Sequence, residues 1–205
     1  FAHSCNCAFA DMGLGLGGDT LKSTAEDLLF NRALPLNSYK TSHFTLDKDS
    51  PNALVMQTSI GQGNTLVSPM HMALITSAIA NDGVLMKPTM IDKIVNNSGD
   101  TVRETEKTEY KRLMTRNEAN ILGKLMKNVV ENGTASALNG RGYTVAGKTG
   151  SAEFDENGSS HSWFVGYSNV DDPDIAIAVI VENGGTGSEA AVPIAADVFD
   201  AYYFD

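Results

Sequence analysis

Apolar residues recur at helical spacing through the first two thirds of this chain, whereas closer to its end they form strand-like runs. The spacing predicts a helix over residues 6–12 that ends at the glycines after it, followed by a helix with Asp19 as its N-cap. The second helix carries one apolar stripe, which consists of Leu21, Ala25, Leu28 and Leu29.

Two further helices have stronger boundary signals. Ser68 is an N-cap residue with proline at the next position, and Gly83 ends the helix that follows. Because this helix is apolar on most sides, we expect it to be deeply buried. Residues 115–118 form a capping box, which predicts another helix that continues to Gly133.

The last third of the chain predicts a small antiparallel sheet, with strands over residues 143–153, 162–168 and 174–182. The run from Ile175 to Val181 has no polar alternation, so we expect helices to cover both of its faces. A hairpin over residues 90–104 and a final helix over residues 192–203 complete the pattern. The final helix presents Ile194, Val198, Phe199 and Tyr202. Together these elements predict an α+β, or layered α/β, domain in which helices flank an antiparallel sheet.

Composition narrows the class of protein. The chain is 42% hydrophobic and 20% charged, as in an ordinary globular protein, and its aliphatic runs are too short to span a bilayer. The net charge of −10 argues against a nucleic-acid-binding protein, which needs a basic face. Cys5 and Cys7 are too close for an unstrained disulfide, and the histidines are scattered, so we expect no metal site and no cofactor.

The glycines at residues 13–18 match the dinucleotide-binding pattern G-x-G-x-x-G. That pattern binds a phosphate only between a strand and a helix, and no strand precedes it here. We therefore interpret these glycines as a helix stop and a turn.

Three short segments carry candidate chemistry: Ser4-Cys5-Asn6, Gly147-Lys148-Thr149-Gly150-Ser151, and the strand segment from Ser162 to Tyr167. Taken singly, each has an ordinary structural explanation. Ser4 and Asn6 are residue types that cap helices, Lys148 is typical of an edge strand, and an aromatic pair in a strand usually packs in the core.

In this order and spacing, the segments resemble the transpeptidase domain of penicillin-binding proteins, whose motifs are S-x-x-K, S-x-N and K-T-G. Ser4-Cys5-Asn6 stands at the second motif and Lys148-Thr149-Gly150 at the third. The resemblance extends through the segments between them and beyond, and it covers nearly the whole chain. The segments that carry it are residues 60–63, 68–73, 79–83, 131–135 and 145–153. Glu153 and the ending at residues 181–185 are more similar to the monofunctional class B enzymes than to class A.

The resemblance implies roles for six residues in acyl transfer, with no metal ion and no cofactor. Lys148 would place a cation beside the nucleophile, Ser4 would relay protons between Lys148 and the leaving group, and Asn6 would hold the amide of the acyl chain. Thr149 would bind a substrate carboxylate, Gly150 would let the substrate backbone approach the strand, and the N–H of Ser151 would donate to the oxyanion.

The nucleophile itself is missing from the chain. None of the ten lysines follows a serine by three residues, and Thr45–Lys48 and Thr108–Lys111 have the spacing only with threonine, after the second motif. The chain also begins at Phe1 without a signal peptide. We therefore expect residues 1–205 to be a partial transpeptidase domain that begins at the second motif, with its N-terminal part missing. On its own it should not form an acyl-enzyme with penicillin.

Three functions remain open for the parent protein. The first is a peptidoglycan D,D-transpeptidase that cross-links stem peptides and binds β-lactam antibiotics. The second is a β-lactam sensor or a serine β-lactamase of the same fold, and the third is a non-catalytic interaction module. The family implies a parent anchored in the bacterial cell membrane, on its extracytoplasmic face, with a glycosyltransferase partner. Because an uncovered sheet edge invites pairing, the chain alone is also expected to self-associate.

Overall fold

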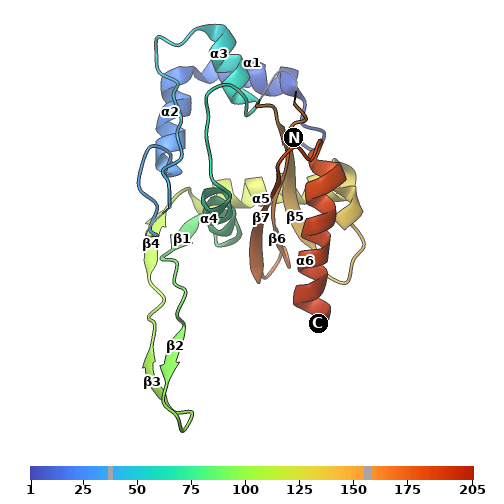
Figure 1. Cartoon of the computed structure of the whole chain (residues 1–205). Coiled ribbons are helices and arrows are strands. Elements are labelled where there is room, and N and C mark those ends of the chain that lie inside the picture. The colour runs from blue at the N-terminus through green and yellow to red at the C-terminus, as the bar shows by residue number, and fades with distance from the viewer. Residues whose placement is uncertain (37–38, 155–157) are drawn as a thin grey trace.

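The computed structural model describes residues 1–36, 39–154 and 158–205. Figure 1 shows helices above, beside and across a central sheet, with a long hairpin extending away from them. The α-helices are α1 (Asn6–Leu16), α2 (Gly18–Asp27), α3 (Asn52–Ser59), α4 (Pro69–Ala80), α5 (Arg116–Asn132) and α6 (Val192–Phe204). The strands are β1 (Val84–Met86), β2 (Lys93–Val95), β3 (Thr101–Glu104), β4 (Glu109–Arg112), β5 (Val145–Ala152), β6 (His161–Ser168) and β7 (Ile175–Val181). A 3₁₀ turn, η1 (Ser136–Leu138), and a π turn, η2 (Gly187–Ala191), complete the elements.

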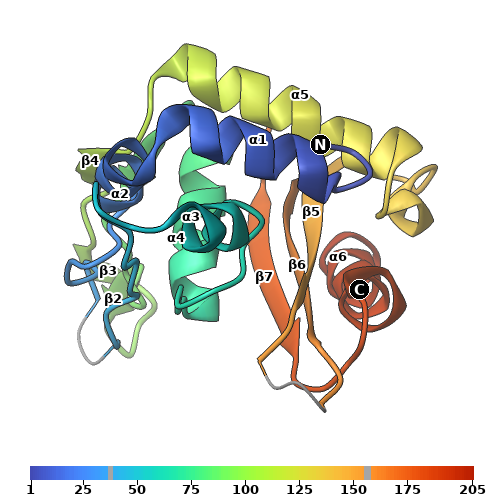
Figure 2. The same cartoon turned by 90° about the horizontal axis from the view of Figure 1, so that it is seen from above.

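The three predicted strands form an antiparallel sheet in the order β5-β6-β7. Helix α6 covers one face of this sheet, and α4 and α5 pack on the other (Figures 1 and 2). Within the face toward α6, Val145, Phe164 and Phe199 lie in one fully buried cluster. Since successive side chains of a strand point to opposite faces, Ala146 and Tyr167 lie on the other face, where they contact Met126 of α5.

The prediction that helices cover both faces of β7 is confirmed, with α4 on one side and α6 on the other. All seven of its residues are nevertheless only half-buried. The physical reason is its position: within the described residues β7 pairs with β6 alone and forms an edge of the sheet. An unpaired edge leaves a row of backbone groups and part of each side chain accessible.

The boundary signals of α4 and α5 are confirmed. The Ser68 side chain accepts a hydrogen bond of 3.2 Å from the backbone N–H of His71, and both halves of the capping box between Thr115 and Glu118 are present. Helix α4 buries its middle turns, and Leu74, Ile75 and Ala78 belong to a second core cluster beneath α2.

Two predicted details near the N-terminus are wrong. Helix α1 does not stop at Gly13 but continues to Leu16, and the chain turns at Gly17, which has a φ of 79°. Gly13 is there for close packing, because a Cβ at this position would lie 1.8 Å from Oγ of Ser59 on α3. Asp19 is not an N-cap, because Gly17 occupies that position. Asp19 lies in the first turn of α2, where its carboxylate interacts favourably with the helix dipole.

The face that α6 presents to the sheet also differs from the prediction. Ile194, Val198 and Tyr202 are exposed, and only Phe199 of the predicted stripe is buried. The buried stripe consists of Val192, Ala195, Ala196 and Phe199. Alanine at two of these four positions lets the helix approach the sheet closely, so large side chains are left on its outer side.

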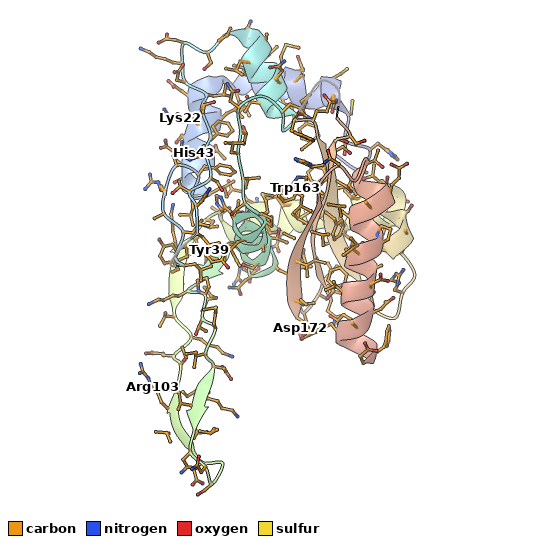
Figure 3. All side chains as sticks on the ribbon, in the orientation of Figure 1. Lys22, Tyr39, His43, Arg103, Trp163 and Asp172 are labelled. Atoms are coloured by element: carbon orange, nitrogen blue, oxygen red, sulfur yellow. The ribbon has the colours of Figure 1, made fainter. Side chains whose placement is uncertain are left out.

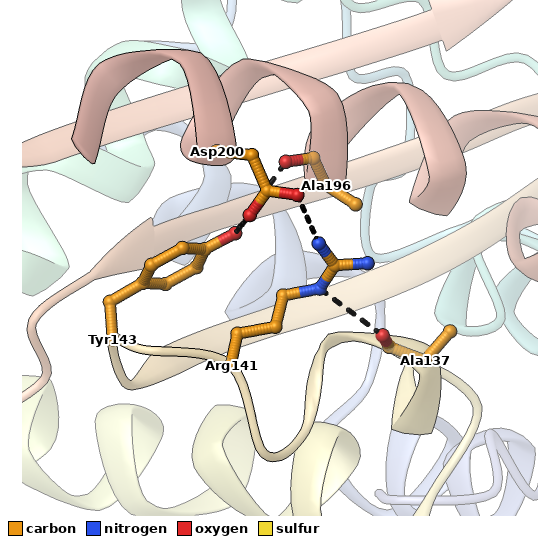
Figure 4. Close-up of polar contacts among 5 residues, drawn as sticks. All are labelled: Ala137, Arg141, Tyr143, Ala196 and Asp200. Atoms are coloured by element: carbon orange, nitrogen blue, oxygen red, sulfur yellow. Dashed lines mark hydrogen bonds and ion pairs between the residues drawn. The ribbon is translucent and has the colours of Figure 1, made fainter. Parts of the chain in front are cut away.

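A polar cluster fixes α6 at its C-terminal half (Figure 4). The carboxylate of Asp200 accepts a hydrogen bond of 2.5 Å from the hydroxyl of Tyr143. It also forms an ion pair with the guanidinium of Arg141. Nε of Arg141 donates a further hydrogen bond to the carbonyl of Ala137 at 3.4 Å. These two partners, Tyr143 first, lower the pKa of Asp200. Burial, and then the bond to Asp200, raises the pKa of Tyr143 to about 12.

The predicted hairpin over residues 90–104 is present as β2 and β3, and it projects away from the helices, with Arg103 near its end (Figure 3). Every residue of both strands is exposed, including Ile94 and Val102. None of the helices formed by the described residues is long and apolar enough to span a membrane.

Candidate active site

The segment before α1 places Ser4 in an uncommon backbone conformation. A hydrogen bond of 3.1 Å from the N–H of Ser4 to the carbonyl of Phe1 closes a turn, and Ser4 has a φ of 50°. Residues other than glycine rarely adopt this left-handed conformation, and such residues cluster at functional sites. Cys5 is the N-cap of α1, with no side-chain cap bond, so neither Ser4 nor Asn6 has the capping role that their residue types suggest.

Lys148 lies on β5 and reaches this turn. Its Nζ donates hydrogen bonds to the hydroxyl of Ser4 and to the carbonyl of Thr149, the latter at 2.7 Å, and it lies 5.9 Å from the centre of the Phe1 ring. The predicted juxtaposition of Ser4 and Lys148, which are 144 residues apart in sequence, is therefore confirmed. Asn6 begins α1 two residues further on and is exposed.

Lys148 is partly desolvated and has no carboxylate partner among the described residues. Burial lowers its pKa, and none of the ion pairs among the described residues includes it. A partly desolvated ammonium without a carboxylate partner can attract an anionic ligand, and it gives up its proton more readily than a surface lysine. The hydroxyl that Nζ of Lys148 contacts is that of Ser4.

Thr149, Gly150 and Ser151 follow Lys148 along a free edge of the sheet, because β5 pairs only with β6 among the described residues. The carbonyls of Thr149 and Ser151 point away from β6. In this structure they accept hydrogen bonds from side chains, Thr149 from Lys148 and Ser151 from Nε2 of Gln62 at 3.2 Å. Alternate outward-facing backbone groups of this kind are what an extended peptide pairs with when it adds to a sheet.

The side chains at this edge differ in exposure. Thr149 is buried, at 8% exposed, and its hydroxyl shares a hydrogen bond of 2.5 Å with that of Thr134. Ser151 is exposed, and its hydroxyl accepts from the N–H of Gly187 at 3.3 Å. The backbone of η2 thus holds the end of the strand that carries the predicted oxyanion donor.

Gly150 has a packing reason in addition to the role that we predicted for it. A Cβ at this position would lie 3.2 Å from Cβ of Trp163, its partner on β6, which is tighter than an ordinary contact. Trp163 is half-buried on the sheet (Figure 3), in agreement with the packing role that its sequence context suggests.

Sequence reasoning missed Thr134 and Gln62 as contributors to this site. Both lie in segments that resemble the family and contact β5 through their side chains, but for Gln62 the sequence carried no signal of that contact. The available signal for Thr134 was a hydroxyl residue directly after Gly133, where α5 ends. A residue at this position lies beyond the end of the helix, so its side chain can contact another element.

A cavity of about 990 Å³ lies elsewhere in the molecule, between α4, α5 and the connection from β6 to β7. Ser4, Asn6 and the β5 edge do not line it. We therefore define the candidate active site by the contact between Lys148 and Ser4 and by the free edge of β5. Cys5 and Cys7 are free and exposed beside it.

Comparison with known proteins agrees with this geometry. The sequence model of the penicillin binding protein transpeptidase domain matches residues 1–200. A peptidoglycan D,D-transpeptidase PbpA of Mycolicibacterium smegmatis is 31% identical over 95% of the chain, which spans 41% of that relative. Penicillin-binding protein 3 of Bacillus subtilis is 32% identical over 88% of the chain, which spans 27% of that relative. The chain thus spans less than half the length of these curated relatives.

Solved structures show the same fold. The D,D-transpeptidase domain of a peptidoglycan glycosyltransferase from Eggerthella lenta superposes with a TM-score of 0.85, at 28% identity, over 98% of this chain and 51% of that one. Penicillin-binding protein A of M. tuberculosis, in its ceftriaxone acyl-enzyme complex, gives a TM-score of 0.86 at 28% identity, over 98% of this chain and 46% of that one.

Proposed function

The chain belongs to the penicillin-binding protein transpeptidase family, and from this membership we propose that it forms part of a serine-type peptidoglycan D,D-transpeptidase. The observation that carries the proposal is the contact between Lys148 and Ser4 at the free edge of β5. It brings two motifs together that are far apart in sequence, next to backbone groups that can pair with a peptide.

The proposed reaction is acyl transfer between two stem peptides. A serine oxygen attacks the carbonyl carbon of the terminal peptide bond, an ester forms, and the carbon–nitrogen bond to the leaving amino acid breaks. The serine proton passes to the leaving amine through Ser4 and Lys148. The amine of a second stem peptide then attacks the ester, forms the cross-link and regenerates the serine.

The residues of this chain would bind and orient the acyl donor. The donor peptide extends along β5, its terminal carboxylate meets the Thr149 hydroxyl and the Lys148 ammonium, and the Ser151 N–H donates to the oxyanion. Gly150 gives the donor backbone room to approach, and Asn6 binds the amide of the acyl chain. A β-lactam enters the same site as an acyl donor.

We further propose that the nucleophile lies in a segment outside these 205 residues, since no serine in the chain precedes a lysine by three positions. The half-buried β7 edge and the exposed outer stripe of α6 are surfaces on which such a segment would pack. The whole protein would then be anchored at the extracytoplasmic face of the membrane and work beside a glycosyltransferase. In isolation the chain would self-associate through its open edge.

A fluorescent penicillin tests the chemistry directly. The chain alone is compared on a denaturing gel with the chain extended upstream by a segment that carries a Ser-x-x-Lys motif. We expect a labelled band for the extended protein and none for the chain alone. Within the extended protein, Lys148→Ala should abolish labelling, and Lys124→Ala, at an exposed position of α5, is the matched control.

Each alternative predicts a different result. A label on the chain alone would show that the nucleophile lies within residues 1–205. A folded extended protein that remains unlabelled would point to the non-catalytic interaction module, and a label lost within seconds would point to a β-lactamase. A stable label without release of D-alanine from a stem peptide would point to a sensor.

A further inference from the structure

Thr134 contacts both halves of the candidate active site. Its backbone N–H donates to the carbonyl of Ala2 at 3.2 Å, two residues before Ser4. Its hydroxyl lies 2.5 Å from the hydroxyl of Thr149, the residue after Lys148 on β5. One residue therefore joins the segment of the second motif to the strand of the third motif.

The end of α5 explains how Thr134 reaches both segments. The helix ends at Asn132, and Gly133 leaves it with an extended conformation. A Cβ on Gly133 would lie 2.3 Å from the carbonyl oxygen of Ala2, so the two backbones can approach this closely only at a glycine. The next residue, Thr134, then lies between the Ala2 segment and β5.

The hydroxyl pair has a defined chemical consequence. A threonine hydroxyl carries one hydrogen, so only one of the two oxygens can be the donor within the pair. If Thr134 donates, the hydrogen of Thr149 is free to point at a ligand. If Thr149 donates, its hydrogen is bonded to the oxygen of Thr134, and only its oxygen is left to meet the ligand. An oxygen lone pair repels an incoming anion.

We propose that Thr134 is a positioning residue for carboxylate recognition: it donates its hydroxyl hydrogen to Thr149 and thereby directs the Thr149 hydroxyl hydrogen toward the carboxylate of the acyl donor. The inference rests on the proposed function, in which Thr149 binds that carboxylate. Hydrogen bonds in series polarise one another, so the bond from Thr149 to the carboxylate is stronger when Thr134 donates to it. The adjacent Lys148 ammonium biases the pair in the same direction, because it attracts the carboxylate that needs the donor.

Thr134→Val isolates this effect. The substitution keeps the β-branched shape and the backbone N–H that bonds to Ala2, and it removes only the hydroxyl. Thr134→Ser keeps the hydroxyl and should retain the wild-type behaviour. The matched control is Thr101→Val, which makes the same change at an exposed position of β3 in the hairpin.

The experiment uses the chain together with its nucleophile-bearing upstream segment and measures the second-order rate of acylation by two probes. Benzylpenicillin carries the carboxylate, and its methyl ester does not. We expect Thr134→Val to slow acylation by benzylpenicillin about fivefold, as for the loss of one hydrogen bond, and to leave the rate with the ester unchanged. Thr134→Ser and Thr101→Val should react with both probes as the wild type does.

Two results would overturn the inference. Equal slowing with both probes would mean that Thr134 serves only the structure of the site, and no slowing with either would mean that it does not direct Thr149. In a Thr149→Val background, the effect of Thr134→Val should disappear, because Thr134 acts through Thr149. If the wild-type extended protein is itself not acylated, the proposed function fails, and this inference fails with it.

Discussion

At β5 and β6, the two faces of the sheet differ in how completely they are covered. Toward α6, Phe164 and Phe199 are 0% exposed, and the Tyr143–Asp200 bond fixes the helix against the sheet. On the opposite face the cover is partial. Ala146 and Tyr167 are buried beneath α4 and α5, whereas Trp163 and Val165, nearer the candidate active site, are half-buried.

The α6 face is packed within the chain, whereas the other face carries Lys148 of the candidate active site. The α6 face buries large apolar side chains and satisfies its polar groups within the chain, so it supplies much of the folding free energy. The other face holds a desolvated lysine without a carboxylate partner, and that arrangement costs stability. Active sites commonly retain such unfavourable groups because the ligand or substrate completes them.

The largest expected effect comes from a cavity on the α6 face. Phe199→Ala should lower the free energy of unfolding by about 3–5 kcal/mol, the usual loss for a fully buried phenylalanine. Val165→Ala, on the other face, should lower it by only about 1 kcal/mol, because that side chain is already half-exposed. Urea denaturation of the two variants measures both values, and equal losses would contradict the distinction between the faces.

The polar cluster of the α6 face should show a smaller effect. Tyr143→Phe removes the bond to Asp200 and should lower the free energy of unfolding by about 1 kcal/mol. The pKa of Tyr143 is raised to about 12 by burial and by Asp200, so the folded state keeps this proton at pH values where the unfolded chain has lost it. Wild-type stability should therefore fall as the pH rises from about 10 to about 12.

Tyr143→Phe should lose that part of the alkaline destabilisation, and denaturation curves at several pH values would show it. If the free energy of unfolding of the variant falls with pH as steeply as that of the wild type, Tyr143 is not the cause of the fall.

The smallest expected effect is on the face that carries Lys148, and its dependence on pH has the opposite sign. Burial lowers the pKa of Lys148, so the folded state releases this proton at a lower pH than the unfolded chain. Stability should therefore rise slightly as the pH increases toward the ordinary lysine value near 10.5. Lys148→Met should lack this rise, whereas Lys124→Met, at an exposed position, should keep it.

In the extended protein, the same shift should be visible in function. Acylation that depends on the ammonium form of Lys148 should decline at a pH below 10.5, the ordinary value. An arginine at this position keeps its charge at higher pH, so any activity left in Lys148→Arg should lack this decline. A decline at the same pH in both proteins would assign it to another group.

Much of the fold could be predicted from the sequence because its signals are local. Each of these signals depends only on residues that are close together in sequence. They are the capping box at Thr115, the helix start at Ser68-Pro69 and the three apolar strand runs, and each is where the sequence predicts it. The glycines of α1 show the limit of such signals. Whether a glycine ends a helix or lets another helix approach depends on a neighbour, here Ser59, that is distant in sequence.

For the candidate active site, the sequence by itself determined which residues are candidates for chemistry: they are Ser4, Asn6 and the run from Lys148 to Ser151, which match the family's motifs. Only the tertiary structure decided how they meet. It brought the Lys148 ammonium to the Ser4 hydroxyl, engaged Thr149 with Thr134, and held the Ser151 carbonyl with Gln62. It also left β7 as an edge strand with half-buried residues, although helices flank both of its faces as its uniform aliphatic run predicts. The physical reason is common to all of these. Periodicity and capping depend on neighbours along the chain, whereas contact between side chains and the covering of an edge depend on which distant segments pack against them.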